Sequence, residues 1–452
     1  MKSLRNWVVS LFAMLFAAMT MVHAQSSNLD KILENLNRYD VKVQGSSNAQ
    51  LWLERARAYY EAESSITKDL AEGIDYAVVQ VAMGRSNSSQ EVKIGGTVYI
   101  EHQYPLVKVY VTKADNIVRG WISSLLSTGH NFCGTALASY QRAAELDASL
   151  NDAIAKELNL LENYYVIGGN AAYALGEKLY ASYHYMMAFN VQVSPSYKGS
   201  LNCDYLMAVP QMMIEDEVDE HSREMAITAL EALMELDYHD GGNVDFYLAY
   251  FYLMQYNDDN LDETLWKALE VACKGVNIYS KNADLIEAAT TLFTMVDVSE
   301  VPAKNISKLK QWADMLLRYN PEDASLWISR GAIYLSMDNY EEAIVSFTKT
   351  LELDSQDADI WSMVGYCYYV LANRALEEVY SASTDEGYYN AQKNCDNLCM
   401  KSLYYYEGAF NLGCRDIEVI ENLKIISYRL RDREGMMAKY EKYKNLYDEM
   451  KK

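Results

Sequence analysis

A block of residues in the C-terminal half of this chain recurs after 34 positions without a gap. Alanine, tryptophan, glycine and tyrosine hold the same places in both copies: Ala324, Trp327, Gly331 and Tyr334 in the first, and Ala358, Trp361, Gly365 and Tyr368 in the second. Self-similarity at such a period indicates consecutive copies of one supersecondary unit, which buries its apolar face only against its neighbours. This repeat constrains the fold more than any other feature of the sequence.

The spacing inside the first copy predicts two helices. Trp327, Gly331 and Tyr334 lie on one face of a helix, where a glycine lets a neighbouring helix approach closely. Turn-forming Asp338-Asn339 follows, and then Ala343 and Phe347 stand one turn apart on a second helix. The pattern W-x2-x-G-x2-Y followed by A-x3-F resembles the tetratricopeptide repeat (TPR) family, which implies an all-α solenoid of helical hairpins.

Weaker copies of the same template extend over nearly all of the chain. We expect about seven to eight hairpins, and the alignment divides the chain into 25–148, 149–321, 322–357, 358–414 and C-terminal capping helices at 415–452. Trp52, Ala56 and Tyr59 predict a first helix whose partner is delayed until Ala136 and Tyr140. Only 322–357 matches the template closely, so residues 149–321 are expected to be degenerate repeats.

Two insertions interrupt this pattern. Between about residues 69 and 118, Val92–Ile94 and Thr97–Ile100 flank Gly95-Gly96 and predict a β-hairpin, to which Leu106–Val111 could add a third strand. This hairpin is either a partner-contact element or an ordered insertion that packs on the edge of the solenoid. A second insertion, at about 371–396, is expected to lengthen one helical hairpin.

The N-terminal segment has the features of a secretory signal. Lys2 and Arg5 precede an apolar run from Trp7 to Met21, and small residues stand before a cleavage site expected between Ala24 and Gln25. As a helix the run would reach only ~23 Å, short of a ~30 Å hydrocarbon core, which disfavours a membrane anchor. Because no lipobox-like cysteine follows, we expect a periplasmic or secreted chain without a lipid anchor. The architecture resembles exported TPR proteins of Gram-negative bacteria.

Charge and residue types narrow the classes of function. The formal net charge is −23 and Lys and Arg form no cluster, so nucleic acids and anionic membrane surfaces would be repelled. An odd number of cysteines at irregular spacing does not indicate a disulfide framework. Cys395 and Cys399 would share one helix face, where packing is a better interpretation than zinc. No histidine pair has metal-ligand spacing, and neither G-x-S-x-G nor a P-loop occurs. We therefore predict no catalytic residue, metal or cofactor.

The resemblance to TPR proteins also implies which side chains line the concave groove. These are the second, fifth, ninth and twelfth residues of each repeat: Ser325, Ile328, Ala332 and Leu335; Asp359, Ser362, Tyr366 and Tyr369; and Asn163, Val166, Asn170 and Tyr173. Ile328 and Ala332 stand where carboxylate-clamp members of the family carry Lys and Asn, which disfavours capture of a terminal carboxylate. An extended peptide or a partner helix is the expected ligand. The alternative is that the tyrosines only pack between adjacent hairpins.

These observations lead to two hypotheses for function. The first is an exported scaffold that binds envelope proteins or peptides through its groove. The second is a carbohydrate-binding component of a glycan-uptake system, because starch-binding outer-membrane proteins also contain TPR-like hairpins. That class usually has a lipid anchor and loop-borne tryptophans, whereas Trp52, Trp327 and Trp361 fall on core positions of the repeats. The sequence therefore favours the scaffold.

Overall fold

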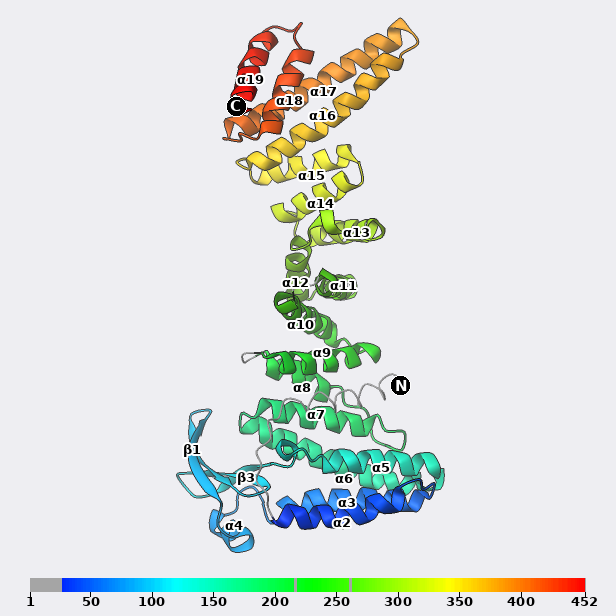
Figure 1. The fold of residues 1–452 in the computed structure, drawn as a ribbon, viewed down its shortest axis with the longest axis vertical. Coiled ribbons are helices and arrows are strands. Elements are labelled where there is room, and N and C mark those ends of the chain that lie inside the picture. Colours follow the sequence, from blue (N-terminus) through cyan, green and yellow to red (C-terminus); the bar gives the residue numbers. More distant parts are fainter. Residues whose placement is uncertain (1–26, 215–217, 260–261, 452) are drawn as a thin grey trace. The chain divides into compact units, whose positions relative to one another are not determined.

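The computed structural model describes residues 27–214, 218–259 and 262–451, and the signal segment expected at 1–24 lies outside this range. Helices predominate in these residues and form consecutive antiparallel pairs (Figure 1). The chain divides into two compact units, Met1–Asp240 and Gly241–Lys452. The expected all-α repeat architecture with a small β insertion near the N-terminus is confirmed.

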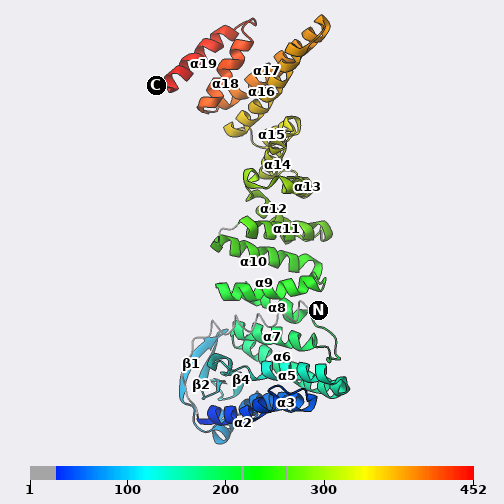
Figure 2. The same ribbon diagram turned by 45° about the vertical axis from the view of Figure 1, so that its right-hand side comes forward.

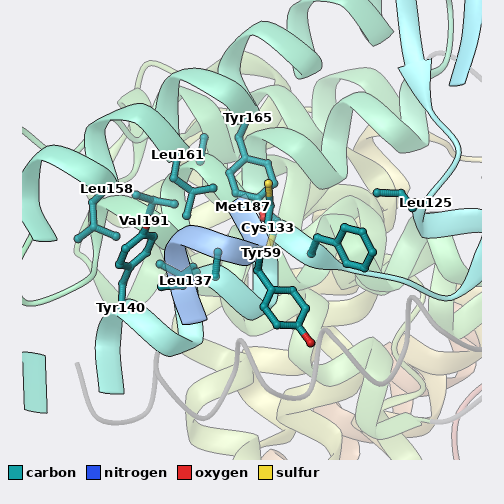
Figure 3. Packing of buried hydrophobic residues seen from close by; sticks show 14 of the residues in the cluster. Tyr59, Leu125, Cys133, Leu137, Tyr140, Leu158, Leu161, Tyr165, Met187 and Val191 are labelled. Atoms are coloured by element: carbon teal, nitrogen blue, oxygen red, sulfur yellow. The ribbon is translucent and has the colours of Figure 1, made fainter. Parts of the chain in front are cut away.

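In its described residues, the first unit contains three helix pairs and one further helix that precedes them. They are α2 (Ser27–Val43), α3 (Ala49–Thr67) paired with α5 (Phe132–Leu146), α6 (Asn151–Ala174) with α7 (Lys178–Gln192), and α8 (Asp204–Met213) with α9 (Glu220–Glu235). The core between α3, α5, α6 and α7 is built from aromatic and aliphatic side chains, among them Tyr140, Tyr165 and Met187 (Figure 3). The helix that begins near Trp52 therefore packs on the one that contains Tyr140, across the inserted segment.

The insertion holds a helix and a four-stranded antiparallel sheet in the order β1-β2-β3-β4, which lies beside the helices of the first unit (Figure 2). Its elements are α4 (Tyr76–Met83), β1 (Ser88–Ile94), β2 (Thr97–Gln103), β3 (Val107–Thr112) and β4 (Val118–Ser123). Ile94 pairs with Thr97 across Gly95-Gly96, and both glycines have positive φ, as a tight hairpin turn requires.

The sequence underestimated this insertion, because it predicted two or three strands ending near residue 118 and no helix. The fourth strand was missed because Arg119 and Gly120 interrupt its apolar pattern. A Cβ at Gly120 would lie 3.0 Å from Cδ1 of Leu175 at the end of α6, so the glycine lets this side chain pack closely on β4.

A buried carboxyl group joins the sheet to the helices. Glu63 on α3 is only 6% exposed, and its Oε1 accepts hydrogen bonds from Tyr164 Oη on α6 at 2.7 Å and from Ser123 Oγ on β4 at 3.1 Å. Burial raises the pKa of Glu63 to about 7, although both hydrogen bonds act in the opposite direction. The side chain therefore gains a charge inside the protein near neutral pH.

The part of the second unit that the structure describes contains five helix pairs. They are α10 (Asn243–Asp259) with α11 (Asp262–Ile278), α12 (Ala283–Thr294) with α13 (Ala303–Tyr319), α14 (Ala324–Ser336) with α15 (Tyr340–Leu353), α16 (Ala358–Ser381) with α17 (Asp385–Asn411), and α18 (Ile417–Arg429) with α19 (Met436–Met450). The 24 and 27 residues of α16 and α17 compare with 13 and 14 in α14 and α15, so the inserted residues lengthen both helices of one hairpin.

The two cysteines of the lengthened hairpin lie in its core. Cys395 and Cys399 on α17 are 3% and 1% exposed, and Cys395 Sγ lies 3.4 Å from the carbonyl oxygen of Ala372 on α16. Burial raises the pKa of both thiols. These side chains therefore serve packing between α16 and α17.

Each recognisable repeat begins with the same local hydrogen bonds. Asn48, Asp323 and Asp357 cap the N-termini of α3, α14 and α16 by accepting backbone N–H groups. Four residues after each cap, the indole N–H of a tryptophan donates to a backbone carbonyl six residues earlier. The pairs are Trp52 with Ser46 at 3.0 Å, Trp327 with Pro321 at 2.8 Å, and Trp361 with Ser355 at 2.9 Å. The incoming chain is thereby fixed against its helix.

An arginine joins three helices in the same way in both units. In the second unit, Arg330 on α14 binds Asp314 of α13 at 2.9 Å and Ser346 of α15 at 2.7 Å, and its guanidinium lies 4.6 Å from the ring centre of Tyr334. In the first unit, Arg55 on α3 makes the equivalent contacts: with Asp40 of α2 at 2.7 Å, with Ser139 of α5 at 2.5 Å and with the Tyr59 ring at 4.7 Å. Helices α2, α3 and α5 thus reproduce the module of α13, α14 and α15.

The two helices of a repeat come into close contact at a glycine of the first helix. A Cβ added at Gly331 would lie 2.4 Å from Cε1 of Phe347 on α15, and one at Gly365 would lie 2.8 Å from Cγ of Tyr406 on α17. Phe347 and Tyr406 are both 2% exposed. The ring of the second helix therefore fills the space that the glycine leaves open.

Replacing Gly331 by alanine should destabilise the second unit by about 1–3 kcal/mol, because the new methyl group and the buried Phe347 ring cannot both keep their places. Urea unfolding followed by circular dichroism measures the change. Ser325→Ala, at an exposed position of the same helix, is the control and should leave the unfolding midpoint within error. An equal effect of the two substitutions would contradict the close packing at Gly331.

Replacing Glu63 by glutamine should reduce the pH dependence of stability. Because the folded state raises the pKa of Glu63 from 4.5 to about 7, the folded protein holds this proton more tightly than the unfolded chain. The free energy of unfolding therefore falls as the pH rises from about 4.5 to 7 and levels off above, by about 3 kcal/mol in total.

Urea unfolding at pH 4.5, 6 and 8 measures this effect. The stability of Glu63→Gln relative to the wild type should increase across this range, whereas the exposed Glu61→Gln should show no such trend. A difference between Glu63→Gln and the wild type that does not vary with pH would be inconsistent with a buried, titrating Glu63.

Candidate functional site

A hollow of about 310 Å³ lies between α10 and α12, the first helices of two consecutive pairs. We call it the α10–α12 groove. Its lining residues are Phe246, Ala249, Tyr250 and Leu253 on α10, and Asp284, Glu287, Ala288, Thr291 and Leu292 on α12. The three- and four-residue spacing within each set places it on one helical face. The groove is therefore formed by two neighbouring helix faces and needs no loop.

The groove lies at the repeat positions from which the sequence predicted a binding surface, but on other helices. Asn282 caps α12 as Asp323 caps α14. Counting from these caps, Asp284, Glu287 and Thr291 of α12 are equivalent to Ser325, Ile328 and Ala332 of α14. These three α12 residues thus occupy the second, fifth and ninth positions of their repeat, and all three line the groove.

The two walls of the groove differ in chemistry. On α10, Phe246 and Tyr250 are stacked with their ring centres 6.5 Å apart, and Leu253 continues the apolar surface by one turn. On α12, Asp284 and Glu287 place carboxylates on the exposed edge. An apolar aromatic wall opposite an acidic edge can hold a ligand that has both apolar and polar or cationic groups.

The predicted groove residues of α14 lie partly within the core. Ile328 and Leu335 are half-buried and pack against the hydrophobic cluster that contains Ile344, Phe347 and Val364. Much of each side chain is therefore committed to the packing of α14 on the following helices. Neither residue lines the α10–α12 groove.

The two predicted tyrosines of α16 have different environments. Tyr366 is 43% exposed and meets the Tyr340 ring edge-on, with the ring centres 6.3 Å apart. Tyr369 is half-buried, and the guanidinium of Arg429 on α18 lies 5.4 Å from its ring centre. Tyr366 is thus available on the surface, whereas Tyr369 packs between adjacent hairpins.

The predicted residues Asn170 and Tyr173 belong to the first unit. Both are exposed on α6, and Asn170 Oδ1 accepts a hydrogen bond of 2.7 Å from Tyr185 Oη on α7. The other four predicted residues lie in the second unit, and none of the six lines the α10–α12 groove. Whether any of the six contacts a partner remains a prediction.

The sequence missed the groove because it placed α10 and α12 among the degenerate repeats of 149–321. Helix α10 carries no W-x2-x-G pattern. One usable signal was present: Asn282 has the capping chemistry of Asp323 and Asp357, and counting from it leads to Asp284, Glu287 and Thr291.

Polar groups outside the groove have structural environments. His184 is 4% exposed and lies 3.3 Å from the carbonyl oxygen of Tyr165, and burial lowers its pKa to about 4, so its ring is neutral at physiological pH. Within the described ranges, no three His, Cys, Asp or Glu side chains gather as metal ligands would. Among the same residues, no helix has both the length and the apolar character that a membrane crossing needs.

Comparison with known proteins identifies the clearest repeat. Residues 324–357 match the tetratricopeptide repeat family model, which confirms the resemblance inferred from Trp327, Gly331 and Phe347. No curated protein sequence matches the chain.

Several solved structures are similar to parts of the chain. MamA is 17% identical over 42% of this chain and 88% of its own, with a TM-score of 0.27. YrrB, described as a TPR protein with an unusual peptide-binding site, is 15% identical over 49% and 92%, with a TM-score of 0.31. A TPR repeats protein from Bacteroides fragilis NCTC 9343 is 12% identical over 59% and 98%, with a TM-score of 0.27.

Proposed function

We propose that this chain, which carries a tetratricopeptide repeat at residues 324–357, is an exported scaffold that binds an extended segment of a partner protein in the α10–α12 groove. One observation carries the proposal. Asp284, Glu287 and Thr291 occupy repeat positions 2, 5 and 9, at which the TPR pattern predicts a binding surface. All three line the hollow of the α10–α12 groove, so the predicted surface is also concave.

The size and shape of the groove suit a peptide segment. Phe246 and Leu253 are seven residues apart, which corresponds to ~10 Å along a helix and to about three residues of an extended chain. The stacked rings of Phe246 and Tyr250 offer a rigid surface that loses little conformational entropy on binding. An extended segment can therefore lie along the groove with one side chain on the rings.

The same structure gives less support to a glycan-uptake component. The indoles of Trp52, Trp327 and Trp361 donate to backbone carbonyls at the starts of their own helices, so they are part of the repeat fold. A sugar-binding platform requires aromatic faces that are free to stack on a ligand. We therefore favour a protein ligand and a role without catalysis.

Export is supported by the apolar segment from Trp7 to Met21 and the small residues before Gln25. The exported form should begin at Gln25, because cleavage removes residues 1–24. Mass spectrometry of the N-terminal peptide after cell fractionation measures this. A chain that keeps Met1 and stays in the cytoplasmic fraction would show that the export proposal is wrong.

Groove binding can be tested with a phage-displayed library of random dodecapeptides selected on the purified chain 25–452. The tightest peptide should bind Tyr250→Ala or Ala288→Arg at least 10-fold more weakly, a loss of about 1.4 kcal/mol, because one change removes an anchor ring and the other fills the hollow. Fluorescence polarisation with a labelled peptide measures the affinity.

Arg318→Ala is the matched control, since Arg318 is exposed on α13 and lies outside the groove. Its affinity should equal that of the wild type, and circular dichroism should show the same helicity for all variants. Wild-type affinity in both groove variants would show that the peptide does not bind in the α10–α12 groove.

A further inference from the structure

A second hollow, of about 410 Å³, begins one helical turn beyond the first. Tyr256 follows Leu253 of the groove by three residues on α10, and Met295 follows Leu292 by three residues after α12. We call this site the Trp266 pocket. Its lining residues are Tyr256, Asp262, Glu263, Leu265, Trp266, Met295, Val296, Asp297, Glu300, Val301, Pro302, Lys304 and Asn305. A segment that lies along the groove therefore has this pocket at its end.

The inner part of the pocket is aromatic and apolar. Tyr256, Trp266 and Val301 are partly buried against the core cluster of the second unit. The Trp266 ring packs on Trp312 with the ring centres 5.3 Å apart, and Trp312 is itself 4% exposed. This support holds the indole in place, so its remaining face can receive a ligand without rearrangement.

The outer part of the pocket is acidic. Asp262 and Glu263 come from the first turn of α11, and Asp297 and Glu300 come from the short turn η4 (Val298–Glu300) and the residue before it. All four carboxylates are exposed, and Lys304 is the one basic side chain in the lining. The negative charge of the pocket agrees in sign with the formal net charge of −23 for the whole chain.

We infer that the Trp266 pocket takes the side chain of a lysine or arginine from the segment bound in the α10–α12 groove; the inference rests on the proposed function. These side chains match both parts of the pocket. Their aliphatic stems can cover Val301 and the Trp266 ring, while the cation remains close to the aromatic faces and the carboxylates. The carboxylates would repel an acidic side chain, and they would not attract a neutral apolar one.

The pocket thus gives the scaffold a preference for basic segments. The groove accommodates the backbone of the bound segment and holds one of its apolar side chains. The pocket adds recognition of a positive charge at one end, which also sets the direction in which the segment lies. Attraction between a basic segment and this acidic chain would weaken as salt screens it.

The test uses the dodecapeptide obtained by groove selection and an analogue in which norleucine replaces its lysines and arginines. The wild type should bind the basic peptide at least 5-fold more tightly than the analogue at low salt. This preference should fall to less than 2-fold in Asp262→Asn/Glu300→Gln, whose exposed substitutions keep side-chain volume. Glu341→Gln, an exposed carboxylate on α15, is the matched control and should keep the full preference.

Fluorine NMR of protein labelled with 5-fluorotryptophan reports on the pocket directly, with the Trp266 signal assigned through Trp266→Phe. The basic peptide should shift this signal, and the norleucine analogue should shift it less. If Tyr250→Ala abolishes binding but the peptide does not shift the Trp266 signal, the peptide binds in the groove and not in the pocket. That result would contradict this inference and support the proposed function.

Two other results have separate meanings. If no selected peptide is sensitive to Tyr250→Ala, the groove proposal fails and this inference fails with it. If maltohexaose shifts the Trp266 signal and the basic peptide does not, the pocket is a sugar site and the inference is wrong.

Discussion

The fold depends on the contact between a residue without a side chain on one helix and an aromatic ring on the next. At Gly331 and Gly365 the two helices of a repeat lie so close that even a methyl group would collide with Phe347 or Tyr406. This contact buries a large ring between the helices and fixes their separation. Because a single helical pair leaves its outer face apolar, the pair is stable only when neighbouring pairs cover it. The repeat period in the sequence is the visible consequence of this packing.

The second constraint is the arginine that joins three helices. Arg55 and Arg330 each meet an aspartate of the preceding helix, a serine of the following one and a tyrosine ring on their own helix. A partly buried guanidinium needs such partners, because an unpaired one would be costly. The first module keeps all of these contacts although a sheet is inserted between its two helices. A long insertion is tolerated because the entropy cost of closing a loop grows only slowly with its length.

The groove and the pocket follow from the same stacking. When the first helices of consecutive pairs lie side by side, their outward faces form a shared hollow, and its chemistry is set by residues that the core does not need. In α10 and α12 these residues are aromatic on one side and acidic on the other. At the position equivalent to Glu287, α14 carries Ile328, which packs inward. One repeat pattern thus supplies both core and binding surface, depending on which side chains occupy it.

The sequence by itself determined the helical repeat and the β-hairpin turn, because each is encoded in residues close together in the chain. Trp327, Gly331 and Phe347 predicted one module, and Gly95-Gly96 predicted the turn between β1 and β2. Only the tertiary structure decided which helix faces form a hollow, that Tyr369 lies against Arg429, and that Glu63 is buried beneath a fourth strand. These features depend on contacts between segments far apart in the chain, and local spacing carries no information about such contacts.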